Sequence, residues 1–83
     1  MNQILQLAER VLGIGAWAFE ESEINEGTLH LCACVKAYGD GYSEYYDSRY
    51  PDECEIRKAP AFAEEIMRRR PDIKRVSITI HHD

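Results

Sequence analysis

Histidine and cysteine alternate in the middle of the chain, at His30, Cys32 and Cys34. Imidazole nitrogen and thiolate sulfur are ligands that zinc prefers in proteins. Residues two apart on a strand point to the same face, so an extended chain would present all three on one surface. Structural zinc sites usually place two cysteines across a tight turn, a spacing that this chain lacks. A metal-binding or thiol-based site at these residues is therefore the alternative interpretation.

All five tyrosines of the chain lie between residues 38 and 50, interleaved with acidic residues. Tyrosine supplies large, amphipathic contact area and is enriched at protein interfaces. Carboxylates beside it favour a basic partner, including a surface that normally receives nucleic-acid phosphates. The competing interpretation is a tyrosine-rich hairpin that covers the edge of its own core. We predict the following partner-binding residues: Tyr42, Glu44, Tyr45, Tyr46, Asp47, Tyr50, Asp52 and Glu53.

The net charge of −5 is unevenly distributed along the chain. Residues 20–55 hold ten of the fifteen acidic residues and only two basic ones, whereas residues 56–75 hold seven basic residues and three acidic ones. A module that binds duplex nucleic acid gains its affinity from phosphate neutralisation, which an acidic protein does not supply. We therefore expect a protein partner and no direct contact with nucleic acid.

Length and cysteine usage limit the class of protein further. The 83 residues predict one domain, residues 1–83, which is small for an enclosed active site. Three irregularly spaced cysteines do not make a disulfide framework, so we expect reduced thiols and a cytoplasmic location. The longest apolar stretch, residues 11–19, is too short for a membrane span, and no secretory signal is evident.

The paired acids do not indicate an enzyme. Neighbouring acids such as Glu20 and Glu21 on a strand would point to opposite faces, and Glu64 and Glu65 on a helix would point outward. Solvated charge accounts for them, so we predict no catalytic residue and no cofactor.

The stretch from Thr28 to Tyr38 is the best-defined strand. Leu29, Leu31, Ala33 and Val35 alternate with the histidine and cysteines, which predicts one face on the core and one facing out. Gly39-Asp40-Gly41 then predicts a hairpin turn that closes a third strand, residues 42–47, onto it. Neither face of that third strand is clearly apolar, so we expect a short edge strand.

The remaining elements follow from apolar spacing and turn residues. Residues 2–12 predict a helix that ends at Gly13. Residues 16–23 predict a strand with Trp17 and Phe19 in the core, followed by a turn at residues 25–27. After a loop over 48–57, a second helix opens with Pro60 in its first turn and ends before Pro71. Residues 73–82 predict the last strand.

The sequence predicts an α+β domain of order α-β-β-β-α-β, with two helices packed on one face of a mostly antiparallel four-stranded sheet. The last strand can lie beside the first or the third, and both positions stay open. The opposite face of the sheet would be uncovered, and its residues would be His30, Cys32, Cys34, Ser77, Thr79 and His81.

The leading expectation for function is a non-catalytic protein-binding module. Size and charge are typical of small acidic inhibitors or adaptors of the phage-encoded or immunity type, an analogy rather than a derivation. The binding surface would be the acidic, tyrosine-rich hairpin and loop over residues 38–55. A homodimer formed through a strand edge or the open face is a further possibility, and no membrane partner is expected.

Overall fold

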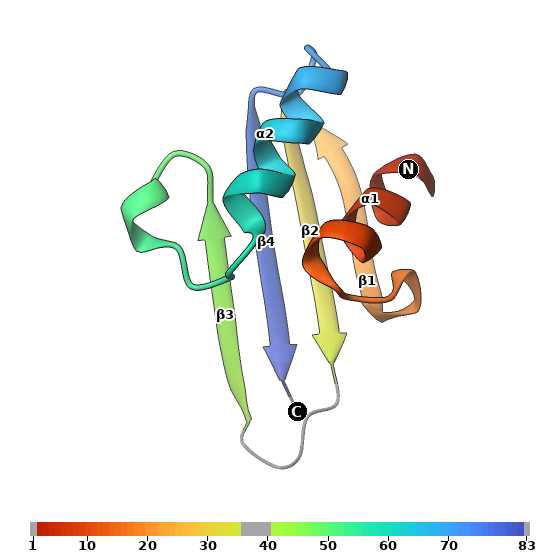
Figure 1. Ribbon diagram of the computed structural model, residues 1–83, viewed down its shortest axis with the longest axis vertical. Coiled ribbons are helices and arrows are strands. Elements are labelled where there is room, and N and C mark those ends of the chain that lie inside the picture. Colours follow the sequence, from red (N-terminus) through yellow and green to blue (C-terminus); the bar gives the residue numbers. More distant parts are fainter. Residues whose placement is uncertain (1, 36–40, 83) are drawn as a thin grey trace.

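The computed structural model describes residues 2–35 and 41–82, which form a sheet with both helices on one of its faces (Figure 1). The elements are α1 (Asn2–Leu12), η1 (Ala16–Ala18), β1 (Phe19–Asn25), β2 (Thr28–Val35), β3 (Tyr42–Asp47), η2 (Pro51–Glu53), α2 (Ala59–Arg69) and β4 (Arg75–His82). The strand order is β1-β2-β4-β3. The predicted element order, the α+β class and the placement of both helices on one face are confirmed.

Both helices form where the apolar spacing predicts them. In α1, Ile4, Leu7 and Ala8 are buried on one stripe. The helix ends at Gly13, whose φ of 75° is a left-handed conformation that suits glycine. Helix α2 begins with proline in its first turn, and its Phe62 is fully buried at the centre of the core.

The two most regularly apolar strands occupy the centre of the sheet. Strands β2 and β4 pair in parallel, and in both of them every second residue is buried between the sheet and the helices. The glutamate-rich β1 and the tyrosine-rich β3 lie at the two edges, each antiparallel to its neighbour. Central strands must bury one whole face under the helices, whereas edge strands tolerate charge, and this difference explains the order.

The predicted hairpin between the second and third strands is wrong. Strand β3 pairs with β4, which lies between β2 and β3. The described residues do not include the predicted last residues of the second strand, Lys36 to Tyr38, or Gly39-Asp40 of the predicted turn. The last strand therefore lies beside the third strand, which is one of the two predicted positions, and its other neighbour is the second strand, which the sequence does not predict.

The turn predicted at residues 25–27 joins β1 to β2. Glu26 and Gly27 both have positive φ, at 51° and 78°, as a two-residue hairpin turn of the I′ type requires. The carbonyl oxygen of Gly27 also accepts a hydrogen bond from the backbone N–H of Lys74, at 2.7 Å. This contact ties the hairpin to the start of β4.

The prediction that Trp17 belongs to the core is wrong. Residues Ala16–Ala18 form a 3-10 turn, in which the N–H of Ala18 donates to the carbonyl oxygen of Gly15 at 2.9 Å. The turn directs Ala18 inward and leaves Trp17 80% exposed. The strand begins only at Phe19, which is partly buried against the core.

Candidate functional site

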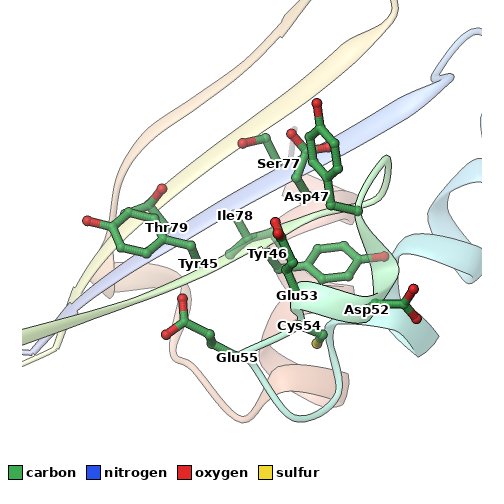
Figure 2. A pocket seen from close by; sticks show the side chains of 11 residues that line it. Tyr45, Tyr46, Asp47, Asp52, Glu53, Cys54, Glu55, Ser77, Ile78 and Thr79 are labelled. Carbon is green, nitrogen blue, oxygen red and sulfur yellow. The ribbon is translucent and has the colours of Figure 1, made fainter.

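A hollow of about 660 Å³ lies along the β3 edge of the sheet, between this strand, β4 and the loop that follows β3 (Figure 2). We call it the acidic hollow, after the charge of its exposed residues. It is lined by Tyr45, Tyr46, Asp47, Tyr50, Asp52, Glu53, Cys54, Glu55, Ser77, Ile78 and Thr79. Six of the eight predicted partner-binding residues are therefore brought together here.

Backbone hydrogen bonds hold the loop against the sheet. The N–H of Ser48 donates to the carbonyl oxygen of Val76, and the N–H of Val76 donates to the hydroxyl of Ser48, both at 2.9 Å. Further along, the N–H of Glu55 donates to the carbonyl oxygen of Tyr45 at 3.3 Å. The contact between Glu55 and Tyr45 covers part of the β3 edge, and together these hydrogen bonds hold the backbone of the loop that carries the acidic residues.

The negative charge of the Asp47 carboxylate is compensated within the protein. Its carboxylate accepts hydrogen bonds from the Arg75 guanidinium, including one from Nε at 3.1 Å, and from the backbone N–H of Arg49 at 3.0 Å. The hydrogen bonds from Arg75 hold the pKa of Asp47 far below its usual range. Asp47 therefore anchors β3 to β4, and its charge is already compensated before any partner binds.

The uncompensated charge of the hollow comes from Asp52, Glu53 and Glu55. All three are exposed, and within the described chain none forms an ion pair. In Figure 2, Glu55 lies on the Tyr45 side of the hollow and Asp52 on the opposite side. The hollow therefore presents several separate carboxylates to solvent rather than one concentrated site.

Two half-exposed tyrosines supply the apolar surface. Tyr45 is 53% exposed and lies beside Thr79 of β4, and Tyr50 is 52% exposed. The guanidinium carbon of Arg49 lies 5.2 Å from the centroid of the Tyr50 ring. A cation–π contact of this kind shows that the rim of the hollow already accommodates an arginine of the same chain.

Three of the eight predicted residues are not part of the exposed surface of the hollow. Tyr46 is buried at 5% exposure and belongs to the core, and burial raises its pKa. Glu44 and Tyr42 point to the helix side of the sheet, because alternate residues of β3 face opposite ways. There Tyr42 stacks on His82 with ring centroids 4.4 Å apart, so neither Glu44 nor Tyr42 lines the acidic hollow.

The histidine–cysteine face of β2 is outward, as predicted. Its side chains lie beside those of β4, with His30 next to Ser77, Cys32 next to Thr79, and Cys34 next to His81. His81 is hydrogen-bonded through Nδ1 to the hydroxyl of Ser43 at 2.8 Å. Within residues 2–35 and 41–82, no group of three or more His, Cys, Asp or Glu side chains is arranged to hold a metal ion.

Thiol chemistry at Cys32 is disfavoured electrostatically. Burial and the charges of Glu21 and Glu20 raise the pKa of this thiol, so the reactive thiolate is scarcer than for an ordinary cysteine. The geometry therefore gives no support to the alternative site at His30, Cys32 and Cys34.

Five residues that line the acidic hollow are outside the predicted set: Cys54, Glu55, Ser77, Ile78 and Thr79. Glu55 continues the acidic run of Asp52 and Glu53, so this signal was present in the sequence. Ser77 and Thr79 were recognised as outward-facing, but their place beside Asp47 and Tyr45 depends on the pairing of β4 with β3. No local pattern in the sequence indicates that pairing.

In the part of the chain that the structure describes, neither helix is long and apolar enough to span a membrane. No protein-family model matches the chain, and neither the curated proteins nor the solved structures include a significant match to it.

Proposed function

We propose that the protein is a non-catalytic binding module that engages a basic surface of a protein partner through the acidic hollow. The observation that carries this proposal is the combination of three exposed, unpaired carboxylates on a loop held against the sheet with two half-exposed tyrosines, Tyr45 on β3 and Tyr50 on the loop. Such a surface joins the two features that protein interfaces use, namely aromatic anchors and complementary charge.

The physical roles of the residues differ. Asp52, Glu53 and Glu55 attract lysine and arginine side chains of the partner and raise the rate of association. Tyr45 supplies a rigid ring against which an arginine plane or an apolar side chain can pack. Asp47 acts indirectly, because its ion pair with Arg75 holds the end of β3 where the loop begins.

The biological role that suits this chemistry is that of an inhibitor or adaptor. A protein that binds nucleic acid carries a basic groove, and an acidic module seated in that groove would exclude the nucleic acid. The proposal includes a cytoplasmic location, where thiols such as Cys32 and Cys54 stay reduced.

Two triple variants with the same change in net charge test the proposal. Asp52→Asn, Glu53→Gln and Glu55→Gln remove the free carboxylates of the hollow, while Glu20→Gln, Glu21→Gln and Glu23→Gln remove three exposed carboxylates of β1 at the opposite edge. Each tagged protein is used to capture partners from a lysate of the source cell, followed by mass spectrometry.

A protein with a basic surface should be captured by the wild type and by the β1 variant, and lost with the hollow variant. We expect at least a tenfold loss of affinity when that partner is purified and titrated, because each close charge pair contributes roughly 0.2–1 kcal/mol or more on desolvation. Equal capture by all three proteins would contradict the proposal, since general acidity and not the hollow would then cause binding.

A further inference from the structure

A second cavity, of about 340 Å³, lies on the helix side of the sheet, away from the acidic hollow. It is bounded by the C-terminal end of α1, the approach to α2, and the ends of β2 and β4. In Figure 1, the lower ends of β3 and β4 extend beyond the part of the sheet that the helices cover. A cavity of this size is within the range of small-molecule sites.

The floor and walls of the cavity are mainly apolar. Ile56 and Ile80 are almost fully buried, at 5% and 3% exposure. Leu12, Ile14 and Val35 are partly buried and pack against the core around them. A ligand body that covers these side chains would remove apolar surface from water, which is the main source of affinity in such sites.

The rim of the cavity is basic, in contrast to the rest of a protein with a net charge of −5. Arg10, Arg57 and Lys58 line it, all three are exposed, and within the described residues none forms an ion pair. Lys58 is also the N-cap of α2, whose first turn contains no acidic residue, so the positive end of that helix adds to the field. We call this site the basic-rimmed cavity.

One carboxylate inside the cavity sets the orientation of a ligand. Glu44 lies with its Oε1 3.6 Å from Nε2 of His82, beyond hydrogen-bond distance, and that nitrogen is buried without a hydrogen-bond partner. A negative group would be repelled from Glu44 at the floor and attracted to the three cations at the rim. A positive group would be attracted to Glu44 at the floor and repelled by the three cations at the rim.

We infer that the basic-rimmed cavity binds a small anionic amphiphile, with its apolar body on the floor and its carboxylate at the rim. The cavity volume corresponds to about ten non-hydrogen atoms, at the roughly 30 Å³ that a water molecule occupies in the liquid. A medium-chain carboxylate fits this chemistry. The inference is independent of the proposed function, since it concerns the opposite face of the sheet.

The test uses decanoate, decanol and decyltrimethylammonium, which share an apolar chain and differ in head-group charge. Each is titrated below its micelle-forming concentration into protein with labelled isoleucine methyl groups, and NMR follows Ile56 and Ile80 in the cavity against Ile4 and Ile73 elsewhere in the core. Decanoate should cause saturable shifts at Ile56, Ile80 and the third cavity isoleucine, Ile14, but not at Ile4 or Ile73, and should bind about fivefold more tightly than decanol.

Matched variants separate rim charge from general charge. Arg57→Gln with Lys58→Gln should weaken decanoate about fivefold and leave decanol unchanged, whereas Arg68→Gln with Arg69→Gln, at the other end of the same helix, should change neither. All four positions are exposed, so the variants should fold. Equal binding of decanoate and decanol, tighter binding of the cationic amphiphile, or no saturable shift at Ile56 and Ile80 would overturn the inference.

Discussion

The acidic hollow and the basic-rimmed cavity share one short strand, β3, and have opposite character. Tyr45 and Asp47 of β3 face the hollow, whereas Glu44 of the same strand faces the cavity. The hollow is open, aromatic and negatively charged. The cavity is apolar with a positive rim, in a protein whose overall charge is negative.

The difference shows how strand alternation lets a small domain present two unrelated surfaces. Side chains of β3 alternate between the face that the helices cover and the face that they leave open. The carboxylates on the two faces differ in their partners. Asp47 forms an ion pair with Arg75, while Glu44 has no comparable partner. A substitution in the core of β3 should therefore affect both surfaces, whereas a substitution on one face should affect only one of them.

The largest effect is expected for Tyr46→Ala, which affects both surfaces. Tyr46 is buried between them at 5% exposure and packs in the core. Truncation of a buried aromatic side chain costs about 3–5 kcal/mol, out of a total stability of roughly 4–12 kcal/mol for a domain of this length. Urea denaturation should show this loss, and a change below about 1 kcal/mol would contradict the burial of Tyr46.

The neighbouring substitution Tyr45→Ala should affect the acidic hollow alone. Tyr45 is half exposed, so we expect a stability change within about 0.5 kcal/mol. Affinity for a short arginine-rich peptide should fall five- to tenfold, because aromatic anchors contribute more than 1 kcal/mol at interfaces. Calorimetric titration measures this, with decanoate binding in the cavity as the control that should not change.

The pairing of Asp47 predicts a dependence of stability on pH. Its pKa is lowered by Arg75, so the stabilisation is complete above the unfolded-state pKa of about 4 and is lost as the pH falls through the lower, folded-state pKa. Asp47→Asn should therefore destabilise the protein at pH 7, and the difference from wild type should shrink progressively below about pH 4. Urea denaturation over this pH range measures the difference, and a constant difference would contradict the assignment.

The smallest effect is expected at Trp17, which belongs to neither surface. Because Trp17 is 80% exposed, Trp17→Phe should change stability by no more than about 0.5 kcal/mol. It is the only tryptophan, so its fluorescence reports directly on this position. Emission should be that of a water-exposed indole and readily quenched by acrylamide. Emission that acrylamide does not quench would instead indicate the core position that the sequence predicts.

Much of the fold could be predicted from local patterns. The alternation of Leu29, Leu31 and Ala33 with outward residues is confirmed, as are both helices and the outward-facing Ser77 and Thr79 of β4. The sheet order could not be predicted, because β3 lacks an apolar face that would specify its neighbour. Trp17 was misplaced because a 3-10 turn shifts the alternation by one residue before β1 begins.

The candidate site was predictable in composition but not in arrangement. Six of the eight predicted residues do line one hollow, together with Glu55: Tyr45, Tyr46, Asp47, Tyr50, Asp52 and Glu53. The alternation along β3 sends Glu44 and Tyr42 to the other face, so these two of the predicted residues are separated from the rest. The pairing of Asp47 with Arg75 joins residues far apart in the sequence, so only the tertiary structure reveals that this acid is already compensated.

The most direct test of the central claim is an NMR titration of labelled protein with the same arginine-rich peptide, at low and at high salt. Saturable backbone shifts should be confined to residues 45–55 and 77–79, and should weaken as salt screens the charges. Shifts that are spread over all exposed acids, or that are strongest at Glu20, Glu21 and Glu23 of β1, would contradict the claim that the acidic hollow is the binding surface.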